Sequence, residues 1–233
     1  MDSSVILITG ARKGIGRYLA EHYAGQGHSV IGCSRGESDF HHVGYRHFCL
    51  DVVDEPRVKE LFAHIRKTHG RLDVLINNAG IASMNLAMTT PVGMVRSILD
   101  TNVVGTFLFS REAAKIMRKA GYGRIVNFST IAVPLKLEGE SVYAASKAAV
   151  VALTEVMANE FASYGITVNA LGPPPVDTDL VRSIPPENLK KRILDRLAIP
   201  RFADFEEIRH SVDFFMNPLS GMITGQTLYY GGT

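Results

Sequence analysis

Short apolar runs alternate along this chain with longer amphipathic stretches, and this alternation most constrains the fold. Runs of four to six apolar residues are typical of strands buried on both faces, and their alternation with helices predicts a parallel sheet covered on both sides. No linker, repeat or low-complexity tract interrupts the pattern, so we expect one α/β domain over residues 1–233. The predicted strands are 5–8, 29–33, 46–50, 72–76, 123–128, 166–171 and 226–230, and the predicted helices about 15–25, 55–68, 92–119 (two stretches) and 142–164.

Composition excludes several classes of protein. Twenty-five Lys and Arg against 23 Asp and Glu leave a formal charge of +2, which argues against nucleic-acid binding. The two cysteines, Cys33 and Cys49, are too few for a disulfide scaffold and suit a reducing compartment. We expect no secretory leader and no membrane span, because no uninterrupted apolar run approaches about 18 residues. These features predict a cytoplasmic protein.

A glycine-rich segment joins the first predicted strand to the first predicted helix. Glycine allows a tight turn and a close approach of backbone to a ligand, and the N-terminus of the next helix favours an anion. Between a strand and a helix, this arrangement predicts a site for the pyrophosphate of a dinucleotide, although a simple tight turn would look similar. The candidate residues are Gly10, Arg12, Lys13, Gly14, Ile15 and Gly16.

The end of the second predicted strand bears on which dinucleotide binds. NAD sites usually carry an acid here for the ribose 2′-hydroxyl. This chain instead has Arg35, whose guanidinium suits a phosphate, and Lys13 and Arg12 add positive charge from the glycine loop. The pattern favours NADP(H). Glu37 and Asp39 lie close by in sequence and leave NAD(H) possible.

Tyr143 and Lys147 open the long helix near the middle of the chain. Their i, i+4 spacing places both side chains on one face. A phenol with a pKa near 10 is a weak base at neutral pH, and a nearby ammonium stabilises the phenolate. The neutral phenol can donate its proton to an oxygen on which negative charge develops. The pair is therefore a candidate acid–base centre.

Together these motifs resemble the short-chain dehydrogenase/reductase family over nearly the whole chain, and especially its 3-oxoacyl-carrier-protein reductases. The resemblance implies a Rossmann-like sheet of about seven strands in the order 3-2-1-4-5-6-7. It also implies that Asn102 completes the active site and that Tyr143 and Lys147 contact the cofactor as well as acting in catalysis. Further cofactor contacts implied by the family pattern are Ser34, Asp51, Val52, Asn78, Ala79, Gly80, Pro173, Val176 and Thr178.

The chain departs from the family pattern at three places. The catalytic serine corresponds to Thr130, which keeps a hydroxyl, and Ser129 is the lesser candidate for that role. Pro174 stands where the family has glycine, so the segment beside the nicotinamide is more rigid. Residues 229–232 read Tyr-Tyr-Gly-Gly in place of Val-Asp-Gly-Gly, which affects an expected subunit contact.

The resemblance implies an oxidoreductase that transfers a hydride between NADP(H) and a carbonyl or secondary alcohol substrate. An acyl chain and a sugar or polyol remain open as substrates, and residues 177–200 are the expected substrate lid. The alternative is a cofactor-binding sensor or structural subunit that has lost turnover through Thr130 and Pro174. The apolar helix around Val150 and Val156 predicts a homodimer or homotetramer.

Overall fold

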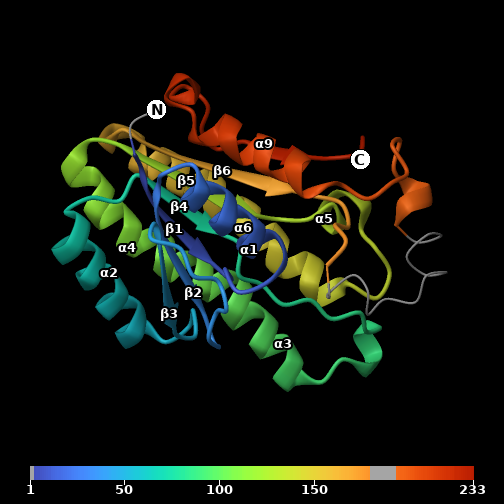
Figure 1. Cartoon of the computed structure of the whole chain (residues 1–233). Helices are drawn as coiled ribbons and strands as arrows, with labels where there is room; N and C mark the ends of the chain where they lie inside the picture. The colour runs from blue at the N-terminus through green and yellow to red at the C-terminus, as the bar shows by residue number, and fades with distance from the viewer. Residues whose placement is uncertain (1–2, 179–192) are drawn as a thin grey trace.

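A parallel sheet forms the centre of the computed structural model, which describes residues 3–178 and 193–233 (Figure 1). Within these residues the sheet has seven strands in the order β3-β2-β1-β4-β5-β6-β7, and this confirms the predicted fold class and order. Every pairing is parallel, with Leu7 of β1 opposite Ile31 of β2 and Leu75 of β4. The strands are β1 (Val5–Thr9), β2 (Ser29–Ser34), β3 (Tyr45–Cys49), β4 (Val74–Asn77), β5 (Gly123–Phe128), β6 (Ile166–Gly172) and β7 (Thr227–Tyr229).

Helices cover both faces of the sheet (Figure 1). On one face, Ile6 and Ile8 of β1 pack with α1 and α9, whereas Leu7 packs with α2, α4 and α6 on the other. The alternation of side chains along a strand explains why a central run such as residues 5–8 is apolar on both faces. The α-helices of the described residues are α1 (Gly14–Gly25), α2 (Glu55–His69), α3 (Val92–Leu99), α4 (Gly105–Ala120), α5 (Ala132–Leu135), α6 (Ser141–Phe161) and α9 (Phe205–Met216).

Shorter helical turns connect these elements. The two helices predicted within 92–119 are α3 and α4, and a π-helical turn, η2 (Asp100–Val104), joins them without a break. Such turns often lie at functional sites, because they redirect a side chain within a helix. The remaining turns are the 3-10 helices η1 (Ala87–Thr89), η3 (Ala162–Tyr164), η4 (Leu194–Arg196) and η5 (Pro218–Ser220).

Helix α9 was not predicted from the sequence. It begins with a capping box in which the Asp204 carboxylate accepts from the third backbone N–H and the Glu207 carboxylate accepts from the N–H of Asp204. Ile208, Val212 and Phe215 are buried from this helix against the sheet. The expected lid lies mostly in residues 179–192, outside the described residues.

Two helical stretches, Val92–Ala120 and Ser141–Tyr164, are long and apolar enough to cross a membrane by length and composition alone. Helices that cover a sheet can meet the same criterion, and both stretches contribute side chains to the core beside β4, β5 and β6. The finding is therefore weak evidence for a span, and the predicted absence of one stays a prediction.

Candidate active site

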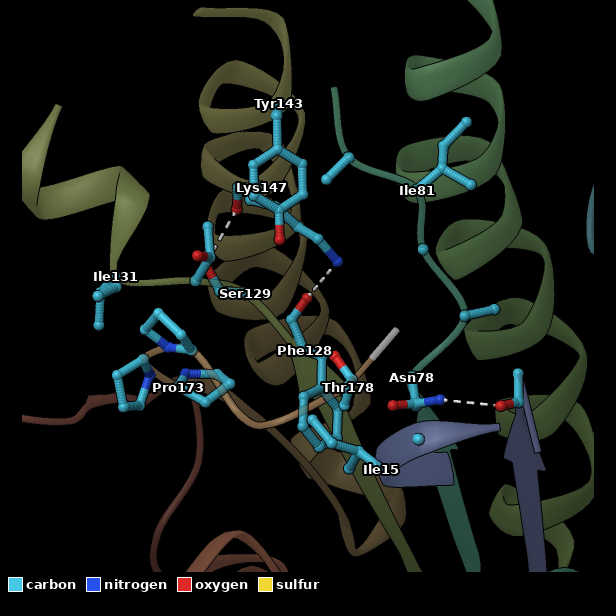
Figure 2. Close-up of a pocket in the computed structure, with 18 of the residues that line it drawn as sticks. Ile15, Asn78, Ile81, Phe128, Ser129, Ile131, Tyr143, Lys147, Pro173 and Thr178 are labelled. Carbon is cyan, nitrogen blue, oxygen red and sulfur yellow. Dashed lines mark hydrogen bonds between the residues drawn. The ribbon is translucent and has the colours of Figure 1, made fainter. Parts of the chain in front are cut away.

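A cleft of about 1190 Å³ opens beyond the carboxyl ends of β1, β4, β5 and β6. In parallel α/β sheets this edge is where ligands bind, because loops from several strands meet there. Figure 2 shows Tyr143 and Lys147 projecting into the cleft from α6, with Asn78 and Ile15 toward its other end. The cleft therefore joins the glycine loop to the candidate acid–base pair.

The glycine loop packs so closely that side chains would not fit. A Cβ on Gly16 would lie 2.4 Å from the carbonyl oxygen of Gly10, and one on Gly10 would lie 2.9 Å from Nδ2 of Asn78. Gly10 and Gly14 also have positive φ angles of 69° and 54°. Helix α1 begins here, and the side chain of its N-cap residue, Lys13, does not cap it. The first residues of α1 therefore face the cleft without a capping side chain on their backbone amides. This is the geometry that cradles a phosphate.

Asn78 ties the loop after β4 to the glycine loop. Its Nδ2 donates to the carbonyl oxygen of Thr9 at 2.9 Å, and the backbone N–H groups of Asn78 and Ala79 donate to Oγ1 of Thr9 at 3.0 and 2.9 Å. The next residue, Gly80, approaches Lys147 so closely that a Cβ there would lie 3.3 Å from Nζ. These contacts fix the glycine loop and Lys147, at the two ends of the cleft, relative to each other.

Ser34 ends β2, Arg35 follows it, and Arg12 reaches the same turn from the glycine loop. The Ser34 hydroxyl donates to the carbonyl oxygen of Gly36 at 2.8 Å and lies 2.9 Å from Nε2 of His47. Arg12 extends over Gly36, where a Cβ would lie 2.7 Å from its guanidinium, and Arg35 is exposed. Within residues 3–178 and 193–233, no ion pair engages Arg12 or Arg35, so both can bind a phosphate.

The two acids near Arg12 and Arg35 are Asp39 and Glu37, and they differ in their ion pairing. Asp39 pairs with Arg17, which also pairs with Glu21 on α1. The pairing with Arg17 lowers the pKa of Asp39 below its ordinary value. Glu37 is exposed. An acid already bound to Arg17 is poorly placed to accept from a ribose hydroxyl, which weakens the case for NAD(H).

Tyr143 and Lys147 lie one turn apart on α6, as the sequence predicts. Lys147 is buried, and its Nζ donates to the carbonyl oxygen of Phe128 at 2.7 Å, at the end of β5 (Figure 2). Burial lowers the pKa of Lys147 to about 8 and raises that of Tyr143 to about 12. At neutral pH the free protein therefore presents a protonated phenol beside an ammonium that still carries its charge.

The structure separates the two candidate hydroxyls. Thr130 and Tyr143 both line the cleft, and Thr130 partly offsets the rise that burial causes in the pKa of Tyr143. Oγ1 of Thr130 accepts from the N–H of Ala132 at 3.2 Å, which leaves its proton for another acceptor. Ser129 instead donates to the carbonyl oxygen of Lys147 at 3.3 Å. This arrangement favours Thr130 for polarising a substrate oxygen.

Asn102 is fully buried in η2 and does not line the cleft. Its Nδ2 donates to the carbonyl oxygen of Ile81 and to Oγ of Ser146, both at 2.9 Å, and its Oδ1 accepts from the N–H of Ile81 at 2.9 Å. These bonds fix the cleft wall at Ile81 against α6. A Cβ on Gly80 would lie 3.2 Å from Oδ1 of Asn102, so this amide adjoins the segment beside Lys147.

Of the other predicted cofactor contacts, some line the cleft and others lie outside it. Pro173 and Thr178 line the cleft, whereas the side chain of Val176 is buried and its backbone bridges to Ala203. Asp51 accepts from the N–H of Val53 at 3.3 Å, outside the cleft. Val52 is buried against Gly105 at the start of α4, also outside the cleft.

Sequence reasoning missed the far wall of the cleft. This wall contains one carboxyl, Glu140, in the turn just before α6, and its apolar members include Ile81, Met84, Leu137 and Ile193. Burial raises the pKa of Glu140 to about 7. An acid three residues before Tyr143 reads in the sequence as an ordinary residue of a helix start. Its only signal is its spacing from Tyr143.

The residues present fit a nicotinamide dinucleotide. The glycine loop admits backbone close to a pyrophosphate, and the candidate acid–base pair lies at the other end of the same cleft. Fold and site together define a nucleotide-dependent oxidoreductase of the doubly wound class. The chain belongs to the short chain dehydrogenase family, whose profile matches residues 4–189.

Similar proteins extend over the whole chain. The 3-oxoacyl-[acyl-carrier-protein] reductase FabG of Escherichia coli (strain K12) is 32% identical over 237 residues, covering 99% of this chain and 97% of that one. The aldohexose dehydrogenase AldT of Thermoplasma acidophilum, in ligand-free form, superposes with a TM-score of 0.89 at 32% identity, covering 99% and 93%. ElxO with NADP bound has a TM-score of 0.89 at 31% identity, covering 97% and 96%. The chain is therefore an NAD(P)-dependent oxidoreductase of this family.

Proposed function

We propose that this protein is a carbonyl reductase that uses NADPH and runs in reverse as a secondary alcohol dehydrogenase. The observation that carries the proposal is the convergence of Tyr143, Lys147 and Thr130 in one cleft with the glycine loop. A cofactor-binding sensor would not need a buried lysine held beside a phenol. Burying a charged group costs stability, so its retention favours a catalytic use.

The chemistry follows from what each side chain can do. A bound nicotinamide supplies the hydride. Thr130 donates a hydrogen bond to the carbonyl oxygen of the substrate, and Tyr143 transfers its proton to that oxygen as negative charge develops. Lys147, held by the carbonyl oxygen of Phe128, stabilises the resulting phenolate. Asn102 acts as a positioning residue, because it fixes Ile81 and α6.

Arg12 and Arg35 support the preference for NADPH. Both cations stand near Ser34 at the end of β2 without a pairing acid among the described residues, and Asp39 is paired with Arg17. A 2′-phosphate would receive charge-assisted hydrogen bonds from the two guanidinium groups. The similarity to ElxO, which was solved with NADP, agrees with this choice.

The comparisons favour two classes of substrate rather than a single compound. Similarity to FabG favours a 3-oxoacyl chain, whereas similarity to AldT favours a sugar. We propose that the protein acts in the cytoplasm as a homodimer or homotetramer. Apolar side chains exposed on α4, on α6 and near the C-terminus support the assembly, and they are Phe107, Val156, Leu219, Met222 and Leu228.

The test compares the wild type with Tyr143→Phe. We expect the wild type to oxidise NADPH when given a panel of ketones, and the variant to lose about 10²- to 10⁴-fold in kcat. Fluorescence titration should give the same NADPH affinity within about threefold for both proteins. Unchanged turnover in the variant would remove Tyr143 as the acid, and NADPH binding without turnover in the wild type would favour the sensor.

A further inference from the structure

Glu140 places a carboxyl in the wall of the cleft, where no group among the described residues binds it. The residue is only 8% exposed, yet it lines the cleft together with Tyr143. It precedes α6 and its side chain does not cap that helix. No hydrogen bond or ion pair reaches this carboxyl from residues 3–178 and 193–233. The acid is thus mostly buried, with its carboxyl facing the cleft and without a partner among the described residues.

The backbone holds this carboxyl next to the reacting centre. The N–H of Ala144 donates to the carbonyl oxygen of Glu140 at 2.7 Å, which makes Glu140 part of the first turn. Tyr143 follows three residues later, on the same helix face and about 4.5 Å along the axis. The preceding Gly139 has a φ of 84°, and its carbonyl oxygen accepts from the N–H of Asn85 at 2.8 Å.

The surroundings of the carboxyl are mostly apolar. Ile131, Leu137 and Ile193 are buried in one cluster against which Tyr143 packs, and Ile81 and Met84 line the same cleft. A cleft for plain alkyl chains would place an apolar residue here, because an unpartnered carboxyl is costly among such side chains. The placement is explained if a ligand brings the missing hydrogen-bond donor.

The charge of the neighbouring groups narrows the choice of donor. Lys147 is buried in the same cleft, and its Nζ is already bound to the carbonyl oxygen of Phe128. An ammonium on the substrate would bury a second cation near Lys147, whereas an anion would meet the carboxylate. A hydroxyl avoids both costs, and it can donate to a carboxyl in either protonation state.

We propose that Glu140 is a specificity-determining residue that accepts a hydrogen bond from a hydroxyl of the substrate. The substrate class is then hydroxylated ketones, and the diols or polyols formed from them, rather than plain alkyl ketones. The hydroxyl lies within a few carbons of the carbonyl, because Glu140 and Tyr143 are one turn apart. This inference rests on the proposed reductase activity.

Matched pairs of ketones test the inference. Hydroxyacetone is compared with 2-butanone, and 4-hydroxy-2-butanone with 2-pentanone, since each pair exchanges a hydroxyl for a methyl group. We expect wild-type kcat/KM to favour the hydroxylated member of at least one pair by about tenfold or more. Glu140→Leu should remove this ratio while keeping reduction of the alkyl ketone, and Glu140→Gln, which still accepts a hydrogen bond, should keep most of it.

Glu138→Leu is the matched control, because Glu138 is an exposed acid two residues away in the same turn. It should leave the ratio unchanged. Equal kcat/KM for both members of each pair, or a ratio that survives in Glu140→Leu, would overturn the inference while the reductase activity stands. Absence of turnover with every ketone in the wild type would instead overturn the proposed function itself. NADPH titration of each variant shows that it is folded.

Discussion

Replacing Glu140 with Gln should change how stability depends on pH. Glu140 has an ordinary pKa of 4.5 when exposed, and burial in the native cleft raises it to about 7. Below pH 4.5 the acid is protonated in both the native and unfolded states and contributes nothing. Above pH 7 it is ionised in both, and the native state carries the full cost of the buried charge. Stability is therefore lost as pH rises from 4.5 to 7.

The size of the effect follows from the two pKa values. The difference between 4.5 and about 7, at about 1.4 kcal/mol per pH unit, gives an upper value of about 3 kcal/mol. Water entering the open cleft reduces this value. Glu140→Gln keeps the shape but not the charge, so its free energy of unfolding should exceed that of the wild type increasingly from pH 4.5 to 7.

Urea denaturation of both proteins, followed by circular dichroism at several pH values, measures this difference. Groups common to both proteins largely cancel in the subtraction. Tyr143 and Lys147 face the same cleft, but their pKa values of about 12 and about 8 lie above the window. A difference in free energy that stays constant between pH 4.5 and 7 would refute the claim that burial raises the pKa of this carboxyl.

Two further predictions concern the cofactor and the hydroxyl of Thr130. Arg35→Ala should raise the Kd for NADPH by about tenfold and leave the Kd for NADH nearly unchanged, as measured by fluorescence titration; an equal loss for both would show that Arg35 does not contact a 2′-phosphate. Thr130→Val should lower kcat by about 10²-fold, whereas Thr130→Ser should retain at least wild-type turnover, as measured by NADPH consumption. Full activity of Thr130→Val would move the polarising role elsewhere, and Ser129→Ala then tests the neighbouring hydroxyl.

Much of the fold could be predicted because its signals are local. Residues 5–8 are all apolar, which is typical of a strand covered on both faces, and every residue of Val5–Thr9 is buried. Helix α9 shows the limit of that reading. Its capping box at Asp204 and Glu207 and its buried Ile208 and Val212 were available as patterns in the sequence. The segment lies after the expected substrate lid, where strands and helices no longer alternate regularly in the sequence.

The candidate site likewise has residues that the sequence predicts and contacts that only the folded chain shows. Tyr143, Lys147 and the glycine loop have fixed spacings that a sequence displays, and Thr130 follows from its distance to Tyr143. The surroundings of Glu140 could not be predicted, because they depend on which side chains from distant loops line the cleft beside the carboxyl. The engagement of Asn102 with Ile81 is likewise a tertiary contact between residues 21 positions apart. Sequence spacing reports shared faces, whereas unused hydrogen-bonding capacity is a property of the folded chain.

Burial shifts three ionisable groups of this cleft, Glu140, Tyr143 and Lys147, toward their neutral forms. The pKa values of Tyr143 and Glu140 rise and that of Lys147 falls, each with desolvation as the first cause. The phenol consequently holds its proton across the neutral range, which suits donation to a developing alkoxide. Removing that proton, as alcohol oxidation requires, needs an added positive charge beside the phenol or a higher pH. Under the proposed function, oxidation should therefore gain relative to reduction as pH rises, which initial rates measured in both directions would check.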